Sequence, residues 1–232
     1  MLRKTFIAVS LPLLLSVTPV SAQDLTQEQV KDLVKEVIRD NPKLIMESLV
    51  QYEQDQKAAQ RQAGLDKVQA ILQDRSYPRL GNPDATPVGV VFLDYNCPHC
   101  RNTHAEIDAW LKDNPERSLV ILDFPVLGPG SVLSARAALA AQEQGKYSEA
   151  LHALMSTQGQ NTDQNIEQTL SEAGFDVSAL AQTMSEEGIT RRLQDNNALA
   201  MQLGITGTPG AVFGDQVISG GFRQADLDAW TQ

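Results

Sequence analysis

The residues best suited to chemistry in this sequence are Cys97, Pro98, His99 and Cys100, which form a C-x-x-C motif. The chain has no other cysteine, so four-cysteine zinc and iron–sulfur sites are excluded. Two thiols at this spacing can form and break a disulfide, and the first of them can attack a disulfide in another molecule. The motif therefore predicts thiol–disulfide exchange.

The position of the motif gives each of its residues a role. The apolar residues 88–93 predict a buried strand, and a helical pattern follows the motif, so we expect Cys97 at a helix N-terminus. Free backbone N–H groups at that end favour the thiolate of Cys97. Pro98 suits the first helical position, and His99 can offer the thiolate a hydrogen bond or a positive charge. Cys100 can attack a mixed disulfide at Cys97 and release the bound molecule.

Two other uses of these cysteines remain open. A structural disulfide between Cys97 and Cys100 would close a very short loop and would therefore add little stability. A metal site built from both thiols and His104 lacks the fourth ligand of structural zinc, although two thiolates can hold Cu(I). We therefore assign no metal and no cofactor beyond the Cys97–Cys100 disulfide, and we keep Cu(I) binding as an alternative.

A distant dipeptide, Thr208-Pro209, supports exchange chemistry. It precedes a predicted strand at residues 211–213, where a trans proline would usually disturb strand pairing. A cis bond there could bring Pro209 against the disulfide, whereas an ordinary turn proline would only reverse the chain. The local sequence does not distinguish these two interpretations.

Residues 1–22 predict a secretory signal peptide cleaved after Ala22. Arg3 and Lys4 precede an apolar stretch, and a small-residue cleavage pattern follows it. A membrane anchor is the alternative, but the apolar stretch is shorter than the roughly 20 residues that a span needs. We therefore expect an exported protein, in a compartment where paired cysteines become oxidised unless a reductant acts on them.

Residues 23–75 predict an N-terminal helical arm. Thr26 and Gln29 form a capping-box pattern, and Asn41-Pro42 interrupts the helical periodicity. The arm could fold back on the main domain, pair with copies of itself or act as a charged linker. Its narrow, regular apolar seam favours self-association. The seam consists of Val30, Leu33, Val34, Val37, Ile38, Leu44, Ile45, Leu49 and Tyr52, with a later patch at Leu65, Val68, Ile71 and Leu72.

Residues 76–232 predict a mixed α/β domain. A loop with one short edge strand is followed by the motif strand and helix, a second core strand at residues 119–124, and a long helical region at residues 131–203. A hairpin and a last helix close the chain. Four large residues fall at helical spacings and are expected in the core: Trp110, Trp230, Met155 and Met201. The composition fits a soluble globular protein, and the net charge of −10 gives no reason to expect a nucleic-acid partner.

Together, the C-x-x-C motif after its strand, the segment at residues 124–129 and Thr208-Pro209 before the hairpin resemble the DsbA family of exported oxidoreductases. The resemblance covers about residues 77–232 and implies a thioredoxin fold with a helical insertion at residues 131–203. The arm is similar to the N-terminal region of the suppressor of copper sensitivity protein C (ScsC) group. Members of that group can trimerise through this region and act as disulfide isomerases.

The resemblance implies that Cys97 is the nucleophile, Cys100 the resolving thiol and His99 a modulator of the thiolate. It also implies that Thr208 and cis-Pro209, together with Pro98, contact peptide substrates. Many relatives carry a buried acid six positions before the first cysteine, where this sequence has Val91. Asp94 is the nearest replacement, although it could equally be a solvated carboxylate at a strand end.

Three functions follow as hypotheses. The favoured one is a periplasmic homotrimeric isomerase that acts on unfolded or misoxidised exported proteins and is kept reduced by a DsbD/ScsB-like membrane reductase. The second is a monomeric dithiol oxidase that is reoxidised by a DsbB-like membrane partner. The third is a periplasmic Cu(I)-binding protein. His99 gives a dipeptide common in strong oxidases, whereas threonine before the cis-proline is commoner in isomerases.

Overall fold

The computed structural model describes residues 26–231, which fall into two compact units. The first unit ends at Tyr52, and the second is Glu53–Gln232. The predicted signal peptide lies outside the described residues. No helix within residues 26–231 combines the length and apolar character needed to cross a membrane.

The first unit contains α1 (Gln27–Asp40) and the beginning of α2 (Pro42–Gln73). The predicted capping box is present, because the Gln29 backbone N–H donates to Thr26 Oγ1 at 3.3 Å and the Thr26 N–H donates to Gln29 Oε1 at 2.9 Å. Asn41 ends α1, and its side chain donates to the carbonyl oxygen of Val37 at 2.8 Å. The predicted helices and the interruption at Asn41-Pro42 are therefore confirmed.

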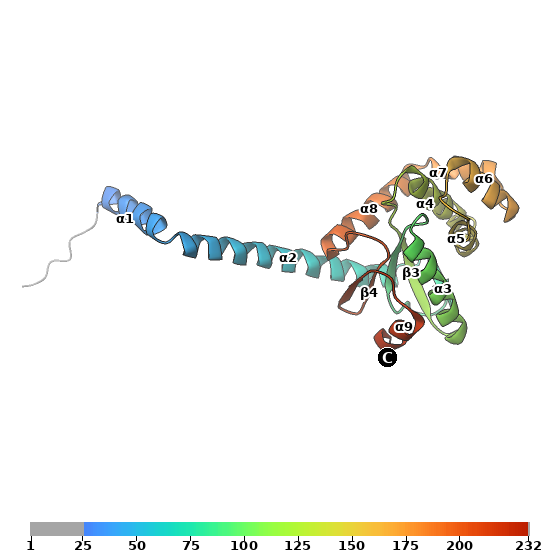
Figure 1. The fold of residues 1–232 in the computed structure, drawn as a ribbon, viewed down its shortest axis with the longest axis horizontal. Helices are drawn as coiled ribbons and strands as arrows, with labels where there is room; N and C mark the ends of the chain where they lie inside the picture. Colours follow the sequence, from blue (N-terminus) through green and yellow to red (C-terminus); the bar gives the residue numbers. More distant parts are fainter. Residues whose placement is uncertain (1–25, 232) are drawn as a thin grey trace, which may run out of the picture. The chain divides into compact units, whose positions relative to one another are not determined.

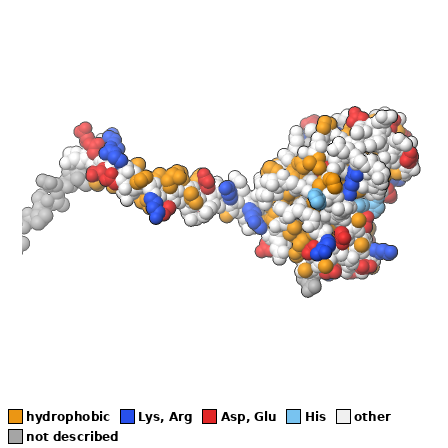
Figure 2. All heavy atoms as spheres, in the orientation of Figure 1, with side chains coloured by type: hydrophobic (Ala, Val, Ile, Leu, Met, Phe, Trp, Pro, Cys, Tyr) orange, Lys and Arg blue, Asp and Glu red, His pale blue; other side chains and the backbone are white. Residues whose placement is uncertain are grey.

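The apolar seam of this unit is exposed. No residue of α1 is buried, and Leu33, Ile38 and Tyr52 are 52%, 53% and 63% exposed. Figure 2 shows hydrophobic side chains gathered along these helices. The remaining members of the seam are also exposed, namely Val30, Val34, Val37, Leu44, Ile45 and Leu49. Met46 and Val50, which the predicted seam did not include, are exposed as well.

The second unit is built on a five-stranded mixed sheet in the order β1-β3-β2-β4-β5. Figure 1 shows β3 and β4 of this sheet among the helices of the unit. Its central strands, β2 and β3, run parallel, and the other neighbouring pairs are antiparallel. The short edge strand predicted before the motif is β1. The strands are β1 (Arg79–Gly81), β2 (Val90–Leu93), β3 (Ser118–Asp123), β4 (Gly210–Phe213) and β5 (Gln216–Ser219).

A hydrophobic core covers each face of the sheet. Alternate residues of the central strands point to opposite faces and therefore belong to different cores. Val91 and Leu93 of β2 belong to the core that contains α3 and most of the helical insertion. Val90 and Phe92 belong to the opposite core. The end of α2 packs into this second core through Val68, Ile71 and Leu72, so the last apolar patch of the predicted arm is part of the compact unit Glu53–Gln232.

Helices fill the predicted insertion between β3 and β4, which confirms a thioredoxin-like α/β fold with a helical insertion. The insertion contains α4 (Pro129–Gln142), α5 (Tyr147–Met155), α6 (Asp163–Glu172), α7 (Val177–Met184) and α8 (Glu187–Leu203). The motif helix α3 (Pro98–Asp113) and the closing helix α9 (Gln224–Trp230) complete the unit. Trp110, Met155 and Trp230 contribute to the core as expected, but Met201 is 49% exposed, so its predicted burial is wrong.

Candidate active site

Cys97 lies at the junction between β2 and α3. It is the N-cap residue of α3, with extended backbone angles, and its N–H donates to the carbonyl oxygen of Asp94 at 3.1 Å. Pro98 occupies the first helical position, as the sequence predicts, and both Pro98 and His99 are exposed. Cys97 itself is 4% exposed, and neither cysteine forms a disulfide.

Cys100 is fully buried beneath the first turn of α3. Its sulfur accepts a hydrogen bond from the Asp94 backbone N–H at 3.4 Å. Burial raises the pKa of the Cys100 thiol well above its usual range, and this outweighs the hydrogen bond from Asp94. Cys100 is therefore held as a neutral thiol, which suits a group that reacts second.

Thr208 and Pro209 meet the motif in space, as the resemblance implies. The Thr208–Pro209 peptide bond is cis, which answers the question that the local sequence left open. The thiol of Cys97 donates to the carbonyl oxygen of Thr208 at 3.3 Å. Thr208 is half-buried and Pro209 is buried, so the carbonyl that faces Cys97 belongs to a well-packed segment.

The buried carboxylate of Asp94 accepts hydrogen bonds from both the motif loop and the start of the insertion. One carboxylate oxygen accepts hydrogen bonds from the Asn96 N–H at 2.8 Å and the Ser131 hydroxyl at 2.7 Å. The other accepts from the N–H groups of Val126 at 2.7 Å and Leu127 at 3.0 Å. The interpretation of Asp94 as a solvated carboxylate is therefore wrong, because its side chain is inaccessible and holds four donors.

The loop that Asp94 holds carries exposed apolar side chains. Val126 is 43% exposed and Leu127 is 50% exposed, and Val132 in the first turn of α4 is 37% exposed. The backbone hydrogen bonds from Val126 and Leu127 to Asp94 place these two residues next to the motif loop. Sequence reasoning noted this segment for its resemblance but did not identify these side chains as a surface.

The motif loop is also fixed to the segment between α5 and α6. The Asn161 N–H donates to Asn96 Oδ1 at 2.6 Å, and Asn96 Nδ2 donates to the Asn161 carbonyl at 3.3 Å. Arg101 donates to the carbonyl oxygens of Tyr95 at 3.1 Å and Thr157 at 2.6 Å. Gly130 packs directly against the Asn161 carbonyl, where a Cβ atom would collide. The insertion therefore helps to position the C-x-x-C loop.

A second buried acid, Asp123, lies at the end of β3, on the same sheet face as Val91 and Leu93. Its Oδ1 accepts hydrogen bonds from the hydroxyls of Tyr95 at 2.7 Å and Tyr147 at 3.0 Å, whereas its buried Oδ2 has no hydrogen-bond partner. Burial raises the pKa of Asp123 to about 7, and the two hydroxyl hydrogen bonds only partly oppose this. Sequence reasoning missed Asp123, although an acid inside a predicted core strand was the available signal.

His104 does not join the two thiols. Instead, it contacts His152 and Asp108, and these three residues form the one group of three potential metal ligands found within residues 26–231. The metal site considered from the sequence, with Cys97, Cys100 and His104 as its ligands, is therefore not assembled in the structure.

Comparisons with known proteins agree with this geometry. A family model for the DSBA-like thioredoxin domain matches residues 90–230. A thioredoxin-like oxidoreductase from Silicibacter pomeroyi DSS-3 is similar in structure, with 37% identity and a TM-score of 0.65, over 68% of this chain and 91% of that chain. A search of curated proteins found no match.

Two further solved structures are similar over more of the chain. The thiol-disulfide exchange protein alpha-DsbA2 from Wolbachia pipientis has 25% identity and a TM-score of 0.66, over 75% of this chain and 95% of that chain. Proteus mirabilis ScsC in a transitional conformation has 26% identity and a TM-score of 0.64, over 88% of this chain and 94% of that chain. A match over 88% of the chain is longer than the unit Glu53–Gln232, so it also includes part of the first unit.

Proposed function

Because the chain belongs to the DSBA-like thioredoxin family, we propose that it catalyses thiol–disulfide exchange on exported proteins through Cys97 and Cys100. The observation that carries this proposal is the position of Cys97. Its sulfur lies at the N-terminus of α3 and faces the Thr208 carbonyl, while Cys100 is buried directly behind it.

The exchange proceeds in two steps. The thiolate of Cys97 attacks one sulfur of a substrate disulfide, so a mixed disulfide forms and the other substrate sulfur leaves as a thiolate. Cys100 then loses its proton and attacks the Cys97 sulfur, which releases the second substrate thiolate and leaves the Cys97–Cys100 disulfide. Two electrons pass from the protein to the substrate, and the reverse sequence oxidises a substrate dithiol.

The surroundings of Cys97 favour an unfolded polypeptide as substrate. Extended peptides present backbone donors and acceptors to the segment of Thr208 and cis-Pro209, and Pro98, next to Cys97 in the chain, is exposed. Val126 and Leu127 add an apolar surface held to the same loop. An unfolded substrate exposes apolar side chains that can contact this surface, whereas a folded protein buries most of its own.

We further propose that the protein is a periplasmic disulfide isomerase that assembles as a homotrimer through its N-terminal helices. Support comes from the exposed apolar seam before Tyr52 and from the similarity to ScsC that extends into this region. In this proposal the predicted signal peptide directs export, and a DsbD/ScsB-like membrane reductase keeps Cys97 and Cys100 reduced.

The test supplies reduced protein to a substrate that carries scrambled disulfides and measures recovery of the substrate's native activity. An isomerase restores the activity catalytically, and Cys97→Ser abolishes the effect. If the oxidised protein instead introduces disulfides rapidly into a reduced substrate while the reduced protein restores no activity, the oxidase function replaces the isomerase. If neither reaction occurs, the exchange proposal itself is wrong.

A further inference from the structure

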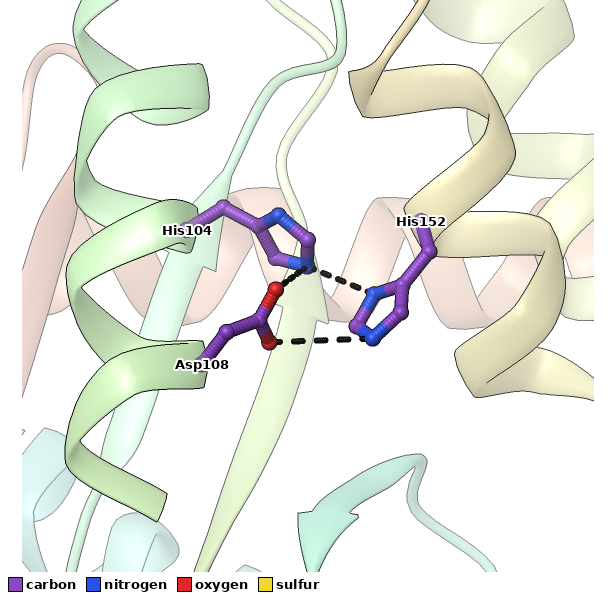
Figure 3. Close-up of side chains that lie close together, drawn as sticks. All are labelled: His104, Asp108 and His152. Atoms are coloured by element: carbon purple, nitrogen blue, oxygen red, sulfur yellow. Dashed lines mark hydrogen bonds and ion pairs between the residues drawn. The ribbon is translucent and has the colours of Figure 1, made fainter. Parts of the chain in front are cut away.

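Outside the thiol site, two histidines and an aspartate converge between α3 and α5. Figure 3 shows His104 and Asp108 on one helix and His152 facing them from another. His104 Nε2 lies 2.9 Å from His152 Nδ1 and 3.6 Å from Asp108 Oδ2. His152 Nε2 lies 3.7 Å from Asp108 Oδ1.

The two separations between a histidine Nε2 atom and an Asp108 oxygen, 3.6 and 3.7 Å, are close to those between the ligands of a bound metal ion. Metal–nitrogen and metal–oxygen bonds of about 2.0–2.2 Å at tetrahedral angles place neighbouring ligand atoms roughly 3.4 Å apart. One ligand atom from each of the three residues lies within 4.8 Å of the others. Small side-chain rotations would therefore bring all three to coordinating distance.

One of the three side chains is buried, and solvent can reach the other two. The side chain of His104 is 8% exposed, whereas those of Asp108 and His152 are 40% and 47% exposed. An ion can therefore enter from solvent beside Asp108 and His152. Three protein ligands leave a fourth coordination position for water.

The spacing of the ligands also follows from the fold. His104 and Asp108 are four residues apart on α3, so they share one face of that helix. A neutral imidazole ring offers a nitrogen lone pair to a metal ion, and both His104 and His152 can contribute one. The Asp108 carboxylate supplies the negative charge of the group.

We propose that His104, Asp108 and His152 form a binding site for a divalent transition metal ion such as Zn²⁺. Imidazole and carboxylate ligands in this combination suit such ions and do not favour Cu(I), which prefers thiolates. The site uses neither Cys97 nor Cys100, so it is independent of exchange chemistry. A bound ion would link the motif helix α3 to α5 of the insertion.

The test uses the full mature chain with Cys97→Ser and Cys100→Ser, so that no thiolate can bind the probe. Titration calorimetry with ZnCl₂ should give one site per chain. His152→Gln and Asp108→Asn, each added separately, should weaken zinc binding by about tenfold or more. His152 and Asp108 are partly exposed, so both variants should fold, and circular dichroism checks that they do.

The third histidine of the chain provides the matched control. His99 lies at the exposed start of α3, so His99→Gln in the same background should leave zinc binding unchanged. Absence of zinc binding to the cysteine-free protein would overturn the proposal. Binding that survives both His152→Gln and Asp108→Asn would also overturn it and would leave the cluster as a hydrogen-bonded group only.

Discussion

The thiol of Cys97 donates to the carbonyl oxygen of Thr208 at 3.3 Å, across 111 residues of sequence. This contact places the Cys97 sulfur beside the backbone of the segment that contains cis-Pro209. Cys100 is completely buried, whereas Cys97 keeps 4% of its surface exposed. The two cysteines therefore differ slightly in exposure, and burial raises the pKa of the Cys100 thiol, although only two residues separate them.

This difference predicts the order of alkylation. In the reduced protein near pH 7, iodoacetamide should modify Cys97 first, because burial keeps Cys100 inaccessible and raises its pKa. A Cys97→Ala variant, which retains only Cys100, should react at least about tenfold more slowly than a Cys100→Ala variant. Mass spectrometry of digested protein gives the site and rate. Equal rates for the two variants would contradict the assigned roles.

The buried carboxyl of Asp123 predicts a pH-dependent stability. Its pKa is raised to about 7 in the folded protein, so the folded state holds this proton more tightly than the unfolded state does. The free energy of unfolding should therefore fall as pH rises from about 4 to 7, by a few kcal/mol at most. Asp123→Asn should reduce this fall, because an amide does not titrate, and its oxygen can still accept from both tyrosine hydroxyls.

Denaturant unfolding of the wild type and Asp123→Asn across this pH range measures the effect as a difference between the two curves. Asp215→Asn, in the exposed turn between β4 and β5, provides a control with the same chemical change. Identical pH dependence in the wild type and Asp123→Asn would show that Asp123 does not retain its proton on folding.

The four hydrogen bonds to Asp94 predict a large structural role for its carboxylate. Asp94→Asn turns one acceptor oxygen into an NH₂ group that faces donors, so it should lower the free energy of unfolding by roughly 2–4 kcal/mol. Denaturant unfolding measures this loss, and Asp215→Asn again provides the exposed control. A loss below about 1 kcal/mol would mean that the hydrogen bonds between Asp94 and its four donors contribute little to the free energy of unfolding.

The exposed seam predicts that assembly depends on α1. Val37→Asp places a charge within the seam and should convert the proposed trimer into a monomer, because an unpaired charge is costly in an apolar interface. Lys35→Gln changes the net charge equally but lies outside the seam, in an exposed ion pair with Asp32, so it should leave assembly intact. Light scattering gives the solution mass. A monomeric wild-type protein would contradict the proposed assembly through the N-terminal helices.

Much of this architecture follows from local pattern. Alternating burial of the central strands, the N-cap position of Cys97 and the capping box at Thr26 each depend on nearby residues, so the sequence predicts them well. The early start of the compact unit at Glu53 was not predicted, because the patch at Val68 continues the helical periodicity of the arm. Periodicity shows that a helix face is apolar, but not what covers it.

The polar groups around the site were the hardest to predict. Asp94 looks like an ordinary strand-end acid until the fold brings Val126, Leu127 and Ser131 to it from more than thirty positions away. The cluster of His104 and His152 depends in the same way on packing between α3 and α5. Such contacts are set by tertiary structure, so the local sequence contains no direct signal for them.

The most direct test of the account is to trap the intermediate on Cys97. A reduced Cys100→Ala variant, incubated with a protein that carries scrambled disulfides, should accumulate mixed disulfides that non-reducing gels detect and mass spectrometry assigns to Cys97. The matched Cys97→Ala variant retains the buried Cys100 and should accumulate none. Equal trapping by both variants, or no trapping by Cys100→Ala, would contradict Cys97 as the nucleophile of thiol–disulfide exchange.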